Sequence, residues 1–166
     1  GGIHPAVEQA QIYSNISLNN PAITREMAEE ALKAVGADKV LQHLEKGLDE
    51  PVIEKGNTLS SGQRQLISFA RALAYNPAIL ILDEATSNID TETEAIIQKA
   101  MDVLKEGRTT FIIAHRLSTI KNADQIIVLD RGRIVEQGIH EELMERKGKY
   151  YQMYQLQQGH ASEHAV

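Results

Sequence analysis

The sequence predicts an α/β protein with a mainly parallel sheet and a helical subdomain. Two observations lead to this fold class. The carboxyl-terminal part alternates continuous apolar runs with a segment of helical periodicity, which is typical of strand-helix-strand units in a parallel sheet. The amino-terminal part has segments of helical periodicity and lacks such runs, which indicates a separate helical region.

Size and composition limit the possible functions. With 166 residues and 42% apolar residues, the chain can bury one core, or a core and a small satellite. The net charge of −6 and the absence of a Lys/Arg cluster argue against nucleic-acid binding. The chain has no cysteine, which excludes disulfides and thiolate metal sites. No apolar run approaches the roughly 18 residues of a membrane span, so we expect the segment itself to be soluble.

The first half of the chain is predicted to be an irregular lead-in followed by helices. Residues 1–21 are rich in Asn, Ser and Pro and are expected to be irregular. Residues 22–76 are predicted to form the helical subdomain, with a helical region interrupted at Gly36. A second helix should run from Ser60 to about Tyr75, just before an Asn-Pro pair that cannot continue it.

Residues 77–157 are predicted to form the α/β half of the chain. Three apolar runs are expected to be strands of a parallel sheet: 78–82, 109–115 and 124–130. The first of these strands is expected to be buried on both faces. A helix should follow the first strand, where Thr91 and Glu94 would form a capping box. A tight hairpin after the third strand and terminal helices complete this half, and residues 158–166 are expected to be a flexible tail.

Polar residues follow two of the predicted strands. Asp83 and Glu84 come after the first strand, and His115 ends the second. Ligands of parallel sheets bind beyond the carboxyl ends of the strands, so these side chains would meet there. Asp83 suits Mg²⁺, and Glu84 would face a second reactant. The alternative is that Asp83 caps the next helix, Glu84 is solvated and His115 is structural.

The stretch "NTLSSGQRQL" is an unusual helix start. A capping box would explain Ser60 and Gln63, but it leaves Gly62 unexplained, and glycine in a helix costs roughly 1 kcal/mol against alanine. A glycine there lets a phosphate oxygen approach backbone N–H groups at the positive end of the helix dipole, and the hydroxyls of Ser60 and Ser61 can also donate. We therefore predict an anion site.

Several motifs resemble those of ATP-binding cassette (ABC) transporters. "LSSGQRQLISFARAL" is similar to their signature motif, whose common form has Gly where this chain has Ser61. "ILILDEAT" resembles their Walker B strand, "SNID" their D-loop, and "IIAHRLSTIKNADQIIVLDRGRIVEQGIHEEL" their switch-histidine region. The match runs in order from about residue 12 to 157. The sequence of residues 111–143 is most similar to that of exporters of drugs, lipids and bacteriocins.

The sequence departs from the family in one important respect. The phosphate-binding P-loop, GxxxxGK[ST], is absent: the pair Gly148-Lys149 is followed by no Ser or Thr and has no glycine five positions before it. The Q-loop glutamine cannot be assigned, although Gln9 and Gln11 lie in the expected region. The resemblance therefore implies the carboxyl-terminal part of a nucleotide-binding domain, that is, a partial P-loop NTPase-like (RecA-like) core with its helical subdomain.

The resemblance also implies a function and its residues. The full-length protein would be an ATPase using ATP and Mg²⁺ to power export, at the cytoplasmic face of the membrane. Two nucleotide-binding domains would pair head to tail beneath the transmembrane domains. The residues implied to contact the partner's ATP are Ser60, Ser61, Gly62 and Gln63, and Asp90 would lie at the dimer seam. The residues implied to act on the chain's own ATP are Asp83 towards Mg²⁺, Glu84 on the attacking water and His115 on the γ-phosphate. The isolated segment, without a P-loop, is expected to be inactive.

Three other functions are alternatives to an ABC transporter. An acyl-transfer enzyme would need a G-x-S-x-G elbow, and the chain has none. The carboxyl-terminal lobe of a chromosome-maintenance or repair ATPase head would carry similar motifs, but it should follow coiled-coil heptads, and residues 22–58 show none. A non-catalytic interaction fragment is the third alternative.

Overall fold

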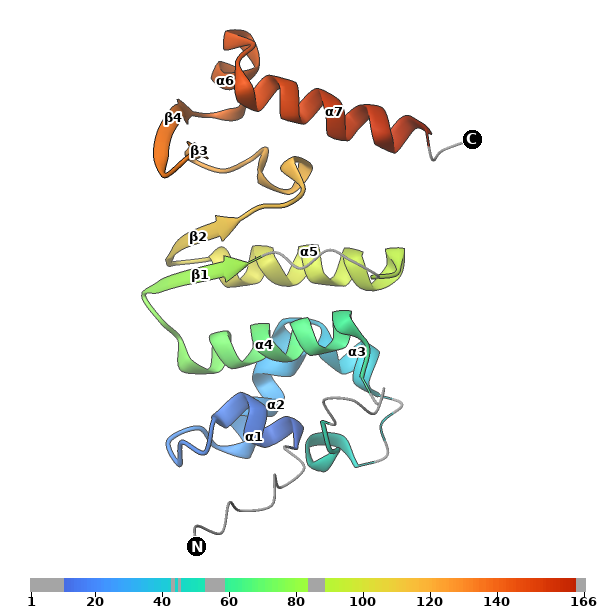
Figure 1. Ribbon diagram of the computed structural model, residues 1–166. Coiled ribbons are helices and arrows are strands. Elements are labelled where there is room, and N and C mark those ends of the chain that lie inside the picture. Colours follow the sequence, from blue (N-terminus) through green and yellow to red (C-terminus); the bar gives the residue numbers. More distant parts are fainter. Residues whose placement is uncertain (1–10, 43, 45, 53–58, 84–88, 164–166) are drawn as a thin grey trace, which may run out of the picture. The chain divides into compact units, whose positions relative to one another are not determined.

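The computed structural model describes residues 11–42, 44, 46–52, 59–83 and 89–163 (Figure 1). The fold is mixed α/β, as predicted, and the described strands form two sheets of two strands each. The chain divides into two compact units, residues 1–111 and residues 112–166. No described helix is long and apolar enough to cross a membrane.

Helices dominate the first part of the first unit. Their bounds are α1 Ile12–Ser17, α2 Arg25–Ala34, α3 Ala37–Leu41, η1 Gly47–Asp49 and α4 Ser61–Tyr75. Helices α1, α2 and α3 all pack against α4, whose Leu66 and Ala70 are fully buried. The predicted interruption at Gly36 is confirmed, because this residue has a left-handed backbone (φ 75°) between α2 and α3. Thr24 caps α2 by accepting a hydrogen bond from the Met27 N–H.

Helix α1 was not predicted, because its residues were expected to be irregular. Ile12 and Ile16 lie one turn apart and are 1% and 0% exposed. The Tyr75 hydroxyl, at the end of α4, donates to the Ser17 carbonyl at 2.6 Å. A six-residue helix is too short to be stable alone, so packing against α4 overrides the local composition of this segment.

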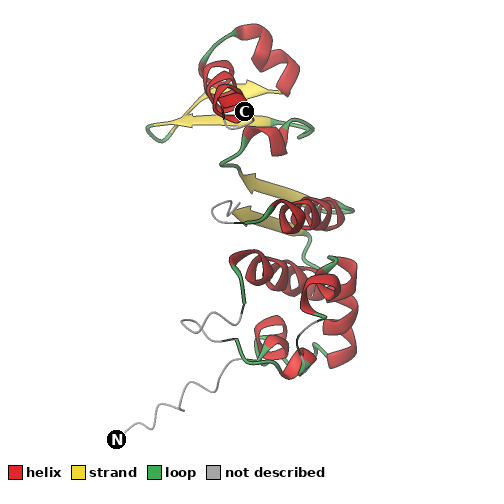
Figure 2. Ribbon diagram, turned by 90° about the vertical axis from the view of Figure 1, so that its right-hand side faces the viewer, coloured by secondary structure: helices red, strands yellow, loops and turns green. Residues whose placement is uncertain are grey.

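A strand-helix-strand unit follows α4. Strand β1 (Ile79–Asp83), α5 (Thr91–Lys105) and β2 (Thr109–Ile113) give a small parallel sheet, and the strands lie beside α5 (Figures 1 and 2). Helices α4 and α5 pack together, so the first unit extends past the boundary expected at residues 76/77. The predicted Thr91–Glu94 capping box is wrong by one residue, since Asp90 is the N-cap of α5.

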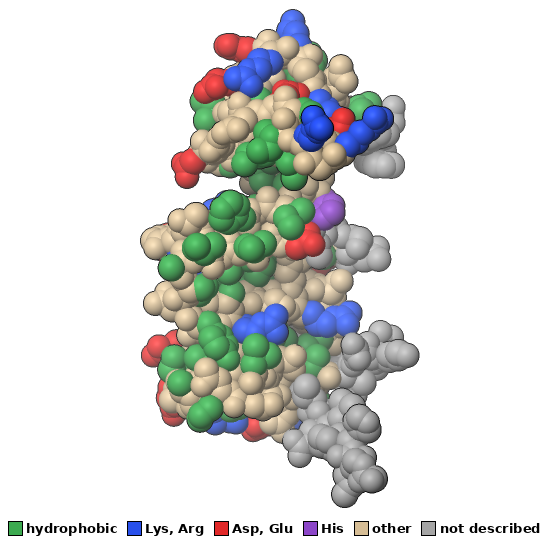
Figure 3. All heavy atoms as spheres, turned by 60° about the vertical axis from the view of Figure 1, so that its left-hand side comes forward, with side chains coloured by type: hydrophobic (Ala, Val, Ile, Leu, Met, Phe, Trp, Pro, Cys, Tyr) green, Lys and Arg blue, Asp and Glu red, His purple; other side chains and the backbone are tan. Residues whose placement is uncertain are grey.

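The expectation that β1 is buried on both faces is wrong for the described structure. Leu80 and Leu82 are buried on one face, whereas Ile79 and Ile81 are 62% and 68% exposed on the other. Phe111 of β2 is also exposed, and hydrophobic side chains gather on the surface at the level of these strands (Figure 3). An unbroken apolar run predicts a strand, but only the layers packed on it decide how many faces are covered.

The second unit is built on an antiparallel hairpin. Its elements are η2 Leu117–Ile120, β3 Ile126–Asp130, β4 Arg133–Gly138, α6 His140–Arg146 and α7 Lys149–Glu163. The hairpin turn is confirmed: Arg131 and Gly132 both have positive φ (50° and 76°), as a tight two-residue turn requires. Strand β3 pairs with β4, so among the described strands it does not join the parallel sheet as predicted.

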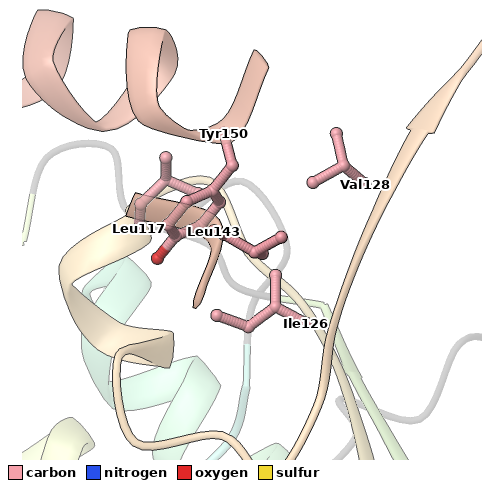
Figure 4. Packing of buried hydrophobic residues seen from close by; sticks show 5 residues of the cluster. All are labelled: Leu117, Ile126, Val128, Leu143 and Tyr150. Carbon is pink, nitrogen blue, oxygen red and sulfur yellow. The ribbon is translucent and has the colours of Figure 1, made fainter. Parts of the chain in front are cut away.

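The core of the second unit lies between this hairpin and the terminal helices. Its buried residues are Leu117, Ile126, Val128, Leu143 and Tyr150 (Figure 4). Tyr150 is 1% exposed, and its hydroxyl lies 2.8 Å from Nδ1 of His140. Helix α7 continues to Glu163, so most of the segment expected to be a flexible tail is helical.

Candidate active site

Three predicted site positions lie at element ends in the first unit. Strand β1 points towards the side of this unit at which α4 and α5 begin (Figure 1). Asp83 is the last residue of β1, Ser60 is the N-cap of α4, and Asp90 is the N-cap of α5. A carboxylate at a strand end and two helix starts therefore share one side of the unit.

The start of α4 is closed by a reciprocal capping box. The Ser60 N–H donates to Oε1 of Gln63 at 2.8 Å, and the Gln63 N–H donates to Oγ of Ser60 at 3.2 Å. These two bonds use the first and last of the four N–H groups that lack an acceptor within the helix. The N–H groups of Ser61 and Gly62 remain directed out of the first turn, at the positive end of the helix dipole. This geometry can bind an anion.

Gly62 has a packing role that sequence reasoning missed. A Cβ atom at Gly62 would lie 2.5 Å from Cγ2 of Thr93, closer than real side chains approach. The glycine therefore lets the start of α4 lie against the start of α5, and it is buried there. No local signal could have revealed this role, because Thr93 lies on another helix. In addition to this packing role, the contribution of Gly62 to phosphate binding stays a prediction.

Asp90 stabilises the start of α5. Its Oδ2 accepts a hydrogen bond from the Thr93 N–H at 3.0 Å. Hydrogen bonding to the Thr93 side chain, and secondly this bond to the Thr93 N–H, lowers the pKa of the Asp90 carboxyl. Thr93 thus joins the two helix starts, because its methyl group lies against Gly62 and its N–H bonds to Asp90. Asp90 is exposed, and its place at a dimer seam stays a prediction.

Asp83 presents an exposed carboxylate at the end of β1. Among the described residues, no group of three or more His, Cys, Asp or Glu side chains could enclose a metal ion. The single carboxylate of Asp83 fits Mg²⁺, which proteins commonly hold by one or two carboxylates together with substrate phosphates and water. The neighbouring Glu84 lies outside the described residues, and its catalytic assignment stays a prediction.

His115 belongs to the second unit and is exposed. Its backbone carbonyl accepts a hydrogen bond from Nε2 of Gln157, on α7, at 2.8 Å. Oε1 of the same glutamine accepts from the Leu117 N–H at 2.8 Å. Sequence reasoning did not single out Gln157, because it lies in a polar stretch with no motif. The convergence of His115 with Asp83, which lies in the first unit, stays a prediction.

Comparison with known proteins identifies the family of the chain. The family model described as "ABC transporter" matches residues 5–87. A probable multidrug resistance ABC transporter ATP-binding/permease protein of Bacillus subtilis, YheH, is 67% identical over 155 residues, which are 93% of this chain and 23% of that protein. An ATP-dependent lipid A-core flippase of Syntrophus aciditrophicus is 49% identical over 88% of this chain and 25% of its own length.

A solved structure is similar over most of the chain. The structure of a bacterial Atm1-family ABC exporter with ATP bound matches with a TM-score of 0.78 and 41% identity, covering 89% of this chain and 26% of that one. The chain thus spans about a quarter of the length of these relatives. The family model matches half of the residues. Together, these similarities show that the chain belongs to the ABC transporter family and is part of its ATP-binding domain.

Proposed function

We propose that this chain is the carboxyl-terminal part of the module that binds and hydrolyses ATP in an ABC exporter, and that hydrolysis powers transport across a membrane. The observation that carries the proposal is the similarity, over 89% of the chain, to an exporter with ATP bound. The relatives reported above are named as a probable multidrug resistance transporter and a lipid A-core flippase, which favours an exporter over a chromosome-maintenance or repair ATPase.

The start of α4 would serve the ATP of a partner domain. In a head-to-tail dimer this helix start covers the γ-phosphate held by the other P-loop. The exposed hydroxyls of Ser60 and Ser61 and the N–H groups of Ser61 and Gly62 supply donors suited to that oxyanion. Gln63 completes the capping box and so maintains the orientation of these donors. Asp90 would contact the partner domain across the seam.

The strand ends would serve the ATP held by the chain's own domain. Mg²⁺ neutralises charge on the phosphates during phosphoryl transfer, and Asp83 would hold it directly or through water. Glu84 would orient the attacking water and accept its proton. His115 would contact the γ-phosphate. Because positioning and charge stabilisation dominate this reaction, the segment alone, without a P-loop, should bind ATP weakly and not hydrolyse it.

The proposed partners are a second nucleotide-binding domain and the transmembrane domains of the exporter. The assembly places this domain at the cytoplasmic face of the membrane. The net charge of −6 is consistent with the absence of nucleic acid among the partners. The transported substrate would be selected by the transmembrane part and is left open.

The decisive experiment is Glu84→Gln in a longer chain in which these residues follow a P-loop half. We expect ATP binding to persist and hydrolysis to fall by roughly 10² to 10⁴, the contribution of a positioned general base. Glu106→Gln, at the exposed carboxyl end of α5, is the matched control and should keep full activity. Equilibrium ATP binding and steady-state turnover measure the two effects. Turnover retained in Glu84→Gln would overturn the proposed role.

A further inference from the structure

We propose that Gln157 is a positioning residue for His115, and that helix α7 thereby controls the placement of the imidazole in the active site. This inference rests on the proposed catalytic role of His115. It concerns a contact within the second unit, between a terminal helix and the segment that follows β2.

The Gln157 side chain uses both of its polar atoms on one short backbone segment. Nε2 donates to the His115 carbonyl and Oε1 accepts from the Leu117 N–H, each at 2.8 Å. The two contacts lie on either side of Arg116, so the amide pairs with the backbone as a neighbouring strand would. Because the donor and the acceptor are both engaged, the amide has one orientation and constrains the segment at two points.

The same segment is anchored by packing immediately after His115. Leu117 is 5% exposed and belongs to the core of the second unit (Figure 4). Thr119 continues the anchoring, since its hydroxyl donates to the Arg116 carbonyl at 2.8 Å. The His115 residue itself is exposed. A rigid backbone that carries an exposed imidazole is the arrangement that a positioned catalytic group requires.

Loss of the amide would change the position of His115 and leave its chemistry intact. Gln157 is partly buried and lies on α7, so it acts only through the backbone of residues 115–117. Misplacement of a catalytic group by about 1 Å can reduce a rate by about 10²-fold. We therefore expect the turnover number to fall, while the KM for ATP, which depends mainly on the P-loop, stays nearly constant.

The first test measures the contact in this chain. In Gln157→Ala, amide hydrogen exchange at Leu117 should accelerate about three- to tenfold, the effect expected for one net hydrogen bond. Gln158→Ala is the matched control, because Gln158 is exposed on the same helix and makes the same change of residue. It should leave exchange at Leu117 unchanged. Exchange at Leu117 that is equal in both variants would overturn the proposal.

The second test measures catalysis in a longer chain that includes a P-loop half. Gln157→Ala should lower kcat about tenfold or more, with KM for ATP within about twofold of the parent. Gln157→Glu keeps an acceptor for the Leu117 N–H but loses the donor to the His115 carbonyl. It should therefore retain protection at Leu117 and still lose turnover. Full turnover in Gln157→Glu would overturn the role of the bond to His115.

His115→Ala separates this inference from the proposed function. If His115→Ala keeps full turnover in the longer chain, the catalytic role of His115 fails, and the positioning role fails with it. If His115→Ala abolishes turnover while Gln157→Ala loses protection at Leu117 and keeps its kcat, the catalytic role stands and the positioning role alone is overturned.

Discussion

Helices α4 and α7 show two ways of capping the amino-terminal end of a helix. Each start places a glycine against a side chain from another element. Gly62 lies against the methyl group of Thr93 on α5, and Gly148 lies against the carboxylate of Glu136 on β4. The cap of α4 is local, because Ser60 and Gln63 satisfy one another. The start of α7 is capped from another element, since Oε1 of Glu136 accepts from the Tyr150 N–H at 3.1 Å.

The difference between the two caps separates residue roles that can be predicted from a short stretch of sequence from roles that depend on distant segments. The α4 capping box is visible in the spacing of Ser60 and Gln63, as the alternative to the predicted anion site, because a capping box needs only four consecutive residues. The Glu136 cap could not be predicted, because the hairpin must first form to bring β4 to the start of α7. At α4 the same residues stabilise the fold and form the proposed phosphate site, so substitutions there test both roles together.

Gly62→Ala should have the largest effect on stability. The added Cβ would meet Cγ2 of Thr93 at 2.5 Å, and overpacking of this kind costs about 1 to 3 kcal/mol of the free energy of unfolding. Thr93→Ser removes that methyl group and should recover much of the loss in the double variant. Urea unfolding of the four chains of this cycle measures the coupling.

Gly148→Ala is the matched control for this prediction. Its Cβ would lie 2.8 Å from Oε1 of Glu136, the end of a flexible side chain that can move away. We expect a smaller loss than for Gly62→Ala. Equal stability of Gly62→Ala and the parent chain would contradict the packing role of Gly62 and leave phosphate binding as its sole explanation.

Tyr150→Phe should have the next largest effect. The variant loses the contact between the hydroxyl and Nδ1 of His140, and a hydrogen bond of this kind contributes about 1 kcal/mol. Burial raises the pKa of Tyr150 above its ordinary value of 10.0. The unfolded chain therefore releases this proton first, so the stability tied to the neutral phenol is complete below pH 10 and is lost as the pH rises through the folded pKa.

Urea unfolding from pH 8 to pH 11 checks this alkaline loss. Tyr150→Phe should be less stable than the parent near pH 8 and should lose less stability above pH 10. Tyr151→Phe, the same change at the next position of α7, is the control. An equal alkaline loss in the parent and in Tyr150→Phe would mean that another group is responsible.

Asp90→Asn should have the smallest effect and should change only the acid side of the stability profile. Hydrogen bonds from the side chain and the N–H of Thr93 hold the pKa of Asp90 below 3.8. The stability that these bonds contribute is complete above that pH and is lost as the pH falls through the folded pKa. Asp90→Asn keeps a good N-cap and should remain close to the parent at pH 7, whereas Asp90→Ala should be less stable. Asp90→Asn should also flatten the loss below pH 3.8, as measured by thermal unfolding.

The exposed faces of β1 and β2 show a further limit of sequence reasoning. Apolar residues at every position of 78–82 predict a strand, and β1 forms there. The same run indicates burial on both faces, yet Ile79 and Ile81 are exposed in the described structure. Residue type reports where a side chain is suited to lie, while the elements packed on each face determine whether it is covered.

The sequence by itself determined the features that depend on neighbours along the chain. These include the helix starting at Ser60, the break at Gly36, the Arg131-Gly132 turn and the family motifs, because caps, turns and periodicity act within a few residues. The tertiary structure decided which residues met across elements: the helical state of α1, the contact of Gly62 with Thr93, the pairing of β3 with β4 and the two bonds of Gln157. These contacts form only when distant segments pack, and the free energy of that packing depends on residues that are far apart in the sequence.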